Sequence, residues 1–289
     1  MSQISAGFLQ NKAPELQAGL ASLFIFGKPT AHPMFLSVDA GNSTIVFGLY
    51  NEETATWHPT LRVDSHRKIS VLQLEKLLGH FFLENDWNLE SVHGIGLSTV
   101  VPDLEPVLMQ CCENFFGRKP YLINGYSYEK LLVQTGNPHE IGSDLMANIT
   151  AAYDAFRDAC IVVDFGTALT FSIVDEQGKV IGINIFPGIK TAINSLFSRT
   201  AKLPKVRLEM PDSILGKTTV HSIQAGIFYG YTALVKGMLS SIAAETNRSY
   251  KIAATGGLSP VMEHLHDRFD LVDIHLTLNG IRQITRANS

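Results

Sequence analysis

The sequence predicts a two-domain α/β protein in which one structural plan occurs twice. The chain has 289 residues, a length that suits two domains with one core each. Short β-rich runs alternate with apolar helical stripes, which is typical of mixed sheets covered by helices. Two similar acidic glycine turns begin at Asp39 and Asp164, 125 residues apart, and each follows a hydrophobic strand. These three observations define the expected fold class.

In the first half, β-rich runs at 35–38, 44–50 and 56–63 are joined by short turns, as in an antiparallel meander. An apolar stripe through Val71, Leu74, Leu78 and Phe82 predicts the next helix. The remaining elements are expected in this order: a strand at 94–101, a helix opening at Pro102, a strand at 121–123, and a helix from Pro138 to about Asp158.

The second half repeats the plan. Strands are expected at 160–163, 169–174, 180–185 and 252–254, with helices near 191–197 and 220–245, from about Ser259, and from about Thr277. We therefore predict an N-terminal extension over residues 1–33, a first domain over 34–157 and a second domain over 158–289.

Composition excludes several classes of function. The net charge of -4 and the pI near 6.2 argue against a surface for nucleic acid, and no apolar run approaches the roughly 20 residues that span a bilayer. The N-terminus lacks a basic region followed by an apolar core, so we expect no signal peptide. The three cysteines include no C-x-x-C pair, which favours a reducing compartment and a cytoplasmic protein. From the charge and the apolar runs, we expect no nucleic-acid or membrane partners.

The two acidic turns have the chemistry of a triphosphate site. They read Asp39-Ala40-Gly41-Asn42-Ser43 and Asp164-Phe165-Gly166-Thr167. A glycine lets backbone N–H groups approach phosphate oxygens, and the hydroxyls of Ser43 and Thr167 can donate hydrogen bonds. The aspartates require a cation or water between themselves and a phosphate. A single Asp-x-Gly is also an ordinary turn, so the duplication carries the functional interpretation.

A third glycine turn follows the predicted strand at 252–254. Gly256 and Gly257 leave room for a flat base or ribose against the backbone, and a following helix N-terminus would add partial positive charge. Alone, this pattern fits a plain strand-to-helix turn equally well.

Together, the three turns resemble the phosphate-1, phosphate-2 and adenosine motifs of the actin-like ATPase superfamily. An ordered set of further runs is similar to the type III pantothenate kinase family, and covers the chain from about Met34 to its end. Residues 39–43 look like the D-x-G-N-T signature of that family, and residues 137–144 look like N-P-x-E-x-G-x-D. The other matching runs are 164–168, 200–204, 216–219, 254–258 and 276–280.

The resemblance implies two ribonuclease H-like halves with ATP in the cleft between them. It also implies ATP-dependent phosphorylation of pantothenate to 4′-phosphopantothenate, the first step of coenzyme A biosynthesis. By the same resemblance, Asp144 is the general base, and Gly142, Asp144 and Thr219 contact pantothenate. The residues implied to bind ATP are Asp39, Gly41, Asn42, Ser43, Gly166, Thr167, Gly256 and Gly257.

Further partners follow from the same family. Asp39 is implied to hold Mg²⁺ through water, and Asp164 to bind a monovalent cation, K⁺ or NH₄⁺. Thr219 is implied to reach the pantothenate of a second subunit, which predicts a homodimer. Without the family match, the favoured interpretation of Asp144 is an ordinary carboxylate on a helix surface.

The acceptor side departs from the family pattern. Leu145 stands where the family has an arginine that pairs with the pantothenate carboxylate, and Thr135 stands where it tends to have a tyrosine. Leucine offers no equivalent of the bidentate guanidinium. Lys190, Arg199 and Lys202 are candidates to replace it. Three hypotheses remain open: a pantothenate kinase with a different cation, a kinase for another small hydroxyl compound, and a nucleotide-binding regulator or pseudokinase without turnover.

Overall fold

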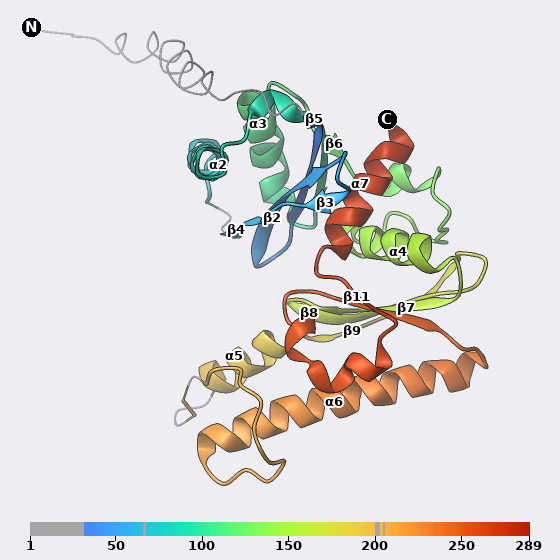
Figure 1. Ribbon diagram of the computed structural model, residues 1–289. Coiled ribbons are helices and arrows are strands. Elements are labelled where there is room, and N and C mark those ends of the chain that lie inside the picture. The colour runs from blue at the N-terminus through green and yellow to red at the C-terminus, as the bar shows by residue number, and fades with distance from the viewer. Residues whose placement is uncertain (1–31, 66–67, 200–202, 205) are drawn as a thin grey trace, which may run out of the picture.

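This computed structural model describes residues 32–65, 68–199, 203–204 and 206–289. Its frame is two β-sheets in which five consecutive strands have the same topology (Figure 1). In the first sheet the order is β3-β2-β1-β5-β6, and β4 also pairs with β2. Its strands are β1 (Met34–Ala40), β2 (Thr44–Asn51), β3 (Thr56–Trp57), β4 (Leu61–Asp64), β5 (Val92–Thr99) and β6 (Tyr121–Leu122).

The second sheet has the order β11-β10-β7-β8-β9. In each sheet the first strand pairs antiparallel with the hairpin strand that follows it and parallel with the strand that returns after a helix. The predicted duplication and the ribonuclease H-like halves are therefore confirmed. The strands of this sheet are β7 (Cys160–Phe165), β8 (Ala168–Val174), β9 (Val180–Pro187), β10 (Lys251–Thr255) and β11 (Leu271–Val272).

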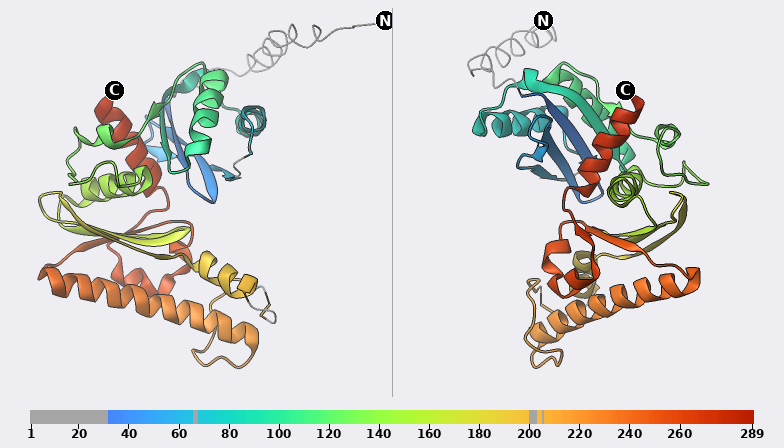
Figure 2. Two further views of the ribbon diagram at one scale, coloured as in Figure 1. Left: turned by 180° about the vertical axis from the view of Figure 1, so that it is seen from behind. Right: turned by 45° about the vertical axis from the view of Figure 1, so that its right-hand side comes forward.

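Helices cover both sheets in layers. Helices α2 and α3 lie on one side of the first sheet, α4 and α7 lie between the two sheets, and α5 and α6 cover the far side of the second sheet (Figures 1 and 2). The helices are α2 (Val71–Glu84), α3 (Glu105–Phe116), α4 (Ser143–Phe156), α5 (Ile189–Arg199), α6 (Thr219–Thr246) and α7 (Leu276–Asn288). Short 3-10 turns occupy Leu89–Ser91, Pro102–Leu104, Gly125–Tyr128, Ser259–Val261 and Glu263–Arg268.

The pair α4 and α7 joins the halves. Helix α7 follows the second sheet in sequence but packs against α4, β1 and β5. At its crossing with α4, a Cβ on Gly280 would lie 1.9 Å from the carbonyl oxygen of Ala147. Only glycine allows these two backbones to approach so closely. The predicted domain boundary between residues 157 and 158 stays a prediction.

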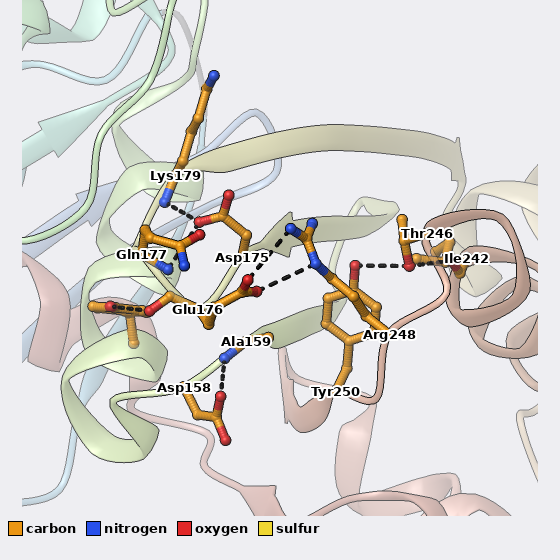
Figure 3. Close-up of polar contacts among 11 residues, drawn as sticks. Asp158, Ala159, Asp175, Glu176, Gln177, Lys179, Ile242, Thr246, Arg248 and Tyr250 are labelled. Carbon is orange, nitrogen blue, oxygen red and sulfur yellow. Dashed lines mark hydrogen bonds and ion pairs between the residues drawn. The ribbon is translucent and has the colours of Figure 1, made fainter.

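The C-terminal end of α6 is linked by polar contacts to the turn between β8 and β9 (Figure 3). Arg248 Nε lies 3.2 Å from Glu176 Oε2, and the Tyr250 hydroxyl donates to Thr246 Oγ1 at 3.0 Å. Within the turn, Asp175 Oδ1 accepts hydrogen bonds from the backbone N–H groups of Gln177 and Lys179. These contacts connect the residues at the C-terminal end of α6 with the turn between β8 and β9.

Three expected elements were wrong in detail. The single strand expected at 56–63 is divided into β3 and β4, because Pro59 has no N–H to donate to the ladder. The helix expected from Pro138 begins at Ser143, after an extended Gly142 at ψ 144°. The segment from Ser259 forms short 3-10 turns in place of a regular helix.

Candidate active site

A cavity of about 540 Å³ lies where the two halves face each other, and both acidic turns line it. Both turns are closed by a hydrogen bond from the glycine, although the first is one residue longer: the N–H of Gly41 donates to Thr44 O at 3.0 Å, and that of Gly166 donates to Ala168 O at 3.1 Å. The cavity is lined by Asp39, Gly41, Asn42, Ser43, Thr44, Val46, Arg62, Asp64, Val100, Asp144, Leu145, Asp164, Phe165, Gly166, Thr167, Ala168, Thr170, Lys190, Thr191, Asn194, Gly256, Gly257, Leu258, Ile274 and Thr277.

The two turns contact each other directly. Thr167 Oγ1 donates to Ser43 Oγ at 2.9 Å, across 124 positions of sequence. The second turn is also fixed by the start of α5, since Gly188 N and Thr191 Oγ1 both donate to Thr167 O. A Cβ on Gly188 would lie 2.4 Å from that oxygen. The hydroxyls proposed for phosphate binding are therefore held in one place by both halves.

Asp39 and Asp164 occupy equivalent positions near the ends of the central strands β1 and β7. Asp39 is directly opposite Ser98 of β5, and Asp164 is directly opposite Thr255 of β10. Paired residues on neighbouring strands share a face of the sheet. The two carboxyl groups thus project from two different sheets into one cavity.

Gly256 makes room for Asp164. Its φ is +88°, a conformation that residues with a side chain rarely adopt, and a Cβ there would lie 2.4 Å from Asp164 Oδ1. At Gly257 a Cβ would meet nothing within 4 Å. One glycine of the third turn is therefore required by the backbone, and the other leaves open space beside the cavity.

Asp144 lies in the first turn of α4, because that helix begins at Ser143. Its Oδ1 accepts the N–H of Leu145 at 2.8 Å, and a Cβ on Gly142 would lie 2.5 Å from the same oxygen. Burial raises the pKa of Asp144, and the two backbone N–H groups near the carboxylate partly offset that effect. A partly buried carboxyl group with a raised pKa accepts a proton more readily.

Burial and neighbouring carboxylates raise the pKa values of Asp39 and Asp164. Burial raises the pKa of Asp39 to about 8, and the charges of Asp144 and Asp164 add to the effect. Burial and the charge of Asp144 raise the pKa of Asp164 to about 7, although Asn148 Nδ2 donates to its Oδ2 at 3.0 Å. Such a cluster is stabilised when a cation binds beside it.

The donor set fits a cation that is held mainly through water and phosphate. Asp39 Oδ1 is buried and has no hydrogen-bond partner within the described part of the chain. No three His, Cys, Asp or Glu side chains among the described residues are grouped to hold a metal ion. Mg²⁺ commonly keeps several waters and binds through one or two carboxylates plus substrate phosphates. An unpaired carboxylate oxygen beside the two turns meets that requirement.

Most residues predicted for the site line the cavity, with two exceptions. Gly142 lies beside Asp144 without lining the cavity, and Thr219 is exposed at the start of α6. Leu145 and Lys190 both line the cavity, whereas Lys202 and the side chain of Arg199 lie outside the described residues. The matching run at 200–204 and the predicted extension at 1–33 are described only at 203–204 and 32–33.

Sequence reasoning missed Asn148 and Thr277 as parts of the site. Thr277 Oγ1 donates to Asn148 Oδ1 at 2.8 Å, and the amide of Asn148 then donates to Asp164. Asn148 is four positions after Asp144, so it shares a face of α4 with that residue. That spacing was the available signal, but its connection to α7 depends on tertiary packing.

Comparison with known proteins decides the family. The family model "Type III pantothenate kinase" matches residues 35–241. The type III pantothenate kinase of Anaeromyxobacter sp. (strain K) is 36% identical over 255 residues, which cover 88% of this chain and 100% of the relative. This chain belongs to the type III pantothenate kinase family. The family member of Koribacter versatilis (strain Ellin345) is also 36% identical, over 267 residues that cover 88% of this chain and 96% of that protein.

A solved structure supports the fold of this family member. The ethanolamine utilization protein EutJ from Carboxydothermus hydrogenoformans aligns with a TM-score of 0.51 at 14% identity, over 93% of this chain and 98% of that one. Within the described residues, no helix is long and apolar enough to cross a membrane.

The buried carboxyl groups predict how stability depends on pH. The pKa of Asp39 in the folded protein, about 8, lies above its ordinary value of 3.8, so the native protein holds more protons than the unfolded chain between these values. Native stability without ligands therefore falls as pH rises through this window. At pH 9, Asp39→Asn should raise the free energy of unfolding by at least about 1 kcal/mol, or roughly 2–4 °C in Tm.

Thermal unfolding of the ligand-free protein at pH 4 and pH 9 checks this expectation. The gain from Asp39→Asn should disappear near pH 4, where Asp39 is neutral in the native state. Asp267→Asn, at an exposed carboxylate paired with Arg268, serves as control and should change stability by less than about 0.5 kcal/mol at either pH. An Asp39→Asn variant that is less stable than the wild type at pH 9 would contradict the electrostatic account.

Proposed function

We propose that this chain transfers the γ-phosphoryl group of ATP to the primary hydroxyl of pantothenate. The observation that carries the proposal is the convergence of three carboxyl groups, from two matching sheets and from α4, on one cavity. Membership of the family supplies the reaction. Phosphoryl transfer needs mainly positioned reactants and neutralised charge, and this arrangement suits both.

ATP lies with its phosphates between the two acidic turns. The hydroxyls of Ser43 and Thr167 and the backbone around Gly41 and Gly166 line the cavity and would contact the phosphate oxygens, and the open space at Gly257 accepts the adenosine. The hydrogen bond between Thr167 and Ser43 brings both turns to one side of the cavity. The two halves therefore bind a single nucleotide together.

Asp144 is the general base of the proposed reaction. Its carboxylate lies at the edge of the cavity, on a different element from the two turns, where an acceptor hydroxyl can approach it. As the bond from that hydroxyl to phosphorus forms, Asp144 accepts the proton. Its raised pKa makes it a stronger base than an exposed aspartate.

Two cations complete the proposed site. Asp39 would hold Mg²⁺ through water, and Asp164 would hold a monovalent cation, K⁺ or NH₄⁺. When bound, these ions neutralise negative charge on the phosphates and on the carboxylates. The unpaired Asp39 Oδ1 and the raised pKa values of Asp39 and Asp164 support this assignment. We also place the enzyme in the cytoplasm, which the three free, buried cysteines support.

The acceptor side admits a second candidate, because Leu145 lines the cavity where the family has an arginine. An apolar side chain favours an acceptor without a carboxylate. Lys190 lines the same cavity from α5, and its ammonium is available to bind the carboxylate of pantothenate. The first function proposed is therefore pantothenate kinase, and the alternative is a kinase for an uncharged hydroxyl compound.

Turnover of pantothenate tests the function and the role of Asp144. The wild type should phosphorylate pantothenate with Mg·ATP in a potassium buffer. Asp144→Asn should lower kcat by about 100-fold or more, since a general base contributes on that order, while ATP affinity stays within about threefold. Asp154→Asn, on the exposed side of the same helix, is the matched control and should retain kcat.

Two results would overturn these assignments. A wild type that binds Mg·ATP but does not phosphorylate pantothenate would exclude the first function and favour the uncharged acceptor. Full turnover by Asp144→Asn would exclude Asp144 as the base.

We propose a homodimer formed through the second half of the chain. Large apolar side chains are exposed on β9, α5, the segment after it and the start of α6; these include Ile181, Ile185, Phe197, Met210, Ile214, Leu215 and Val220. Except for β9, these elements lie together at one end of the molecule (Figure 1). A second copy would cover this surface and bring its own Thr219 toward the acceptor side.

Light scattering at micromolar concentration checks the dimer. Because charge in an apolar interface is unfavourable, Ile214→Glu combined with Leu215→Glu should give monomers and lower turnover by at least about tenfold. Leu132→Glu, which changes an exposed leucine of the first half, should leave the mass unchanged. A monomeric wild type would remove the basis for placing Thr219 in a partner's site.

A further inference from the structure

Arg62 lies on the same row of the first sheet as Asp39. Val46 is directly opposite Asp39 on one side and directly opposite Arg62 on the other. Residues paired in this way share a face, so Arg62 and Asp39 are two strands, or about 10 Å, apart at their Cα atoms. The charge of Arg62 lowers the pKa of Asp39, which shows that the guanidinium is within electrostatic reach of the carboxylate.

The alternation along β4 directs Arg62 into the cavity. Leu61 and Val63 pack against the core of the first half, so Arg62 and Asp64 project from the opposite face, and both line the cavity. The N–H of Ser65 donates to Ser43 O at 2.9 Å. That bond attaches the end of β4 to the first acidic turn, so the position of Arg62 is linked to the phosphate-binding backbone.

The guanidinium of Arg62 has no protein partner within the described part of the chain. Other arginines of the structure are paired: Arg157 with Asp154, Arg248 with Glu176, and Arg286 with Glu52. Arg62 makes no hydrogen bond or ion pair with a described residue, although two carboxylates of the cavity, Asp39 and Asp64, are near it in the sheet. Its five N–H donors therefore remain available to a ligand.

The described lining of the cavity contains only two cationic side chains, and they come from opposite halves. Lys190 comes from α5, beside the second acidic turn, and Arg62 comes from β4, beside the first. A triphosphate between the turns lies between these two cations. Arg62 is the one that can form two parallel hydrogen bonds with a phosphoryl group, because its guanidinium is planar and forked.

We propose that Arg62 contacts the phosphoryl group during its transfer, as a catalytic residue in addition to Asp144. The proposal rests on the proposed kinase function. In the step, the acceptor oxygen bonds to the γ-phosphorus as the bond from that phosphorus to the bridging oxygen breaks. The electron pair of the broken bond stays on the β-phosphate of ADP, and the hydroxyl proton goes to Asp144. Arg62 exchanges no proton and stabilises the charge on the phosphoryl oxygens.

Two anions offer the same chemistry to a guanidinium: the transferring phosphoryl group and the carboxylate of the acceptor. The position of Arg62, on the row of Asp39 and attached to the first turn, favours the phosphoryl group.

The test compares Arg62→Ala and Arg62→Lys with Arg248→Ala. Arg248 is the matched control, since it forms a surface ion pair with Glu176 at the far end of α6 (Figure 3). Arg62→Ala should lower kcat by about 100-fold or more, as expected for a cation that stabilises the transition state. Arg62→Lys should recover part of that loss. Melting temperatures close to that of the wild type would show that the variants are folded.

Two further measurements distinguish the transferring phosphoryl group from the acceptor carboxylate as the anion that Arg62 contacts. Turnover should fall equally with pantothenate and with its amide, which has the same hydroxyl and no carboxylate. Affinity for a non-hydrolysable Mg·ATP analogue should fall by about tenfold in Arg62→Ala, while affinity for Mg·ADP stays within about threefold. Nucleotide affinity does not depend on the acceptor. This measurement therefore tests the contact between Arg62 and the phosphoryl group even if the wild type does not use pantothenate and the proposed function is wrong.

Two outcomes would overturn the proposal. If Arg62→Ala keeps the kcat and the nucleotide affinities of Arg248→Ala, Arg62 does not contact the phosphoryl group. If activity is lost with pantothenate but kept with its amide, the guanidinium binds the acceptor carboxylate.

Discussion

The placement of three carboxyl groups in one cavity between two sheets, two of them fully desolvated, is the constraint on which this structure depends. Asp39 and Asp164 project from the central strands of opposite halves, and Asp144 adds a third acid from α4. Without a ligand, the charged forms of these groups are disfavoured, and burial raises the pKa of Asp39 to about 8 and that of Asp164 to about 7. Active sites commonly hold such unfavourable groups in place through the surrounding fold.

That surrounding fold is the layer of α4 and α7 between the sheets. Gly280 lets the two helices approach closely, and Thr277 of α7 reaches Asp164 through Asn148 of α4. The last helix of the chain therefore helps to orient a carboxyl group of the second sheet while packing on the first. The two acidic turns have little freedom to separate, because Thr167 and Ser43 are hydrogen-bonded across the cavity. The proposed binding of one nucleotide by both halves relies on this packing.

The sequence predicted the features that repeat locally and missed those that arise from packing. The turns at Asp39 and Asp164 were recognisable because each follows a buried strand, and their duplication predicted both halves. The start of α4 was misjudged because Pro138 suits a first helical turn, whereas the extended backbone at Gly142 delays the helix to Ser143. The convergence of Arg62 and Lys190 on one cavity requires knowing where β4 and α5 lie, which no local pattern specifies. Thr219 lies away from the cavity of its own chain, and its assignment still depends on the proposed dimer.

Proton release on nucleotide binding tests the central claim most directly. If Asp39 is largely protonated and Asp164 is partly protonated at pH 7 without ligand, and both become ionised beside bound cations, Mg·ATP binding at pH 7 should release about one proton per bound nucleotide. Isothermal titration calorimetry in two buffers of different ionisation enthalpy measures this number. The account predicts proton release at pH 7 that diminishes by pH 9, with affinity rising over the same range. Binding that releases no protons, with the same affinity from pH 6 to pH 9, would contradict it.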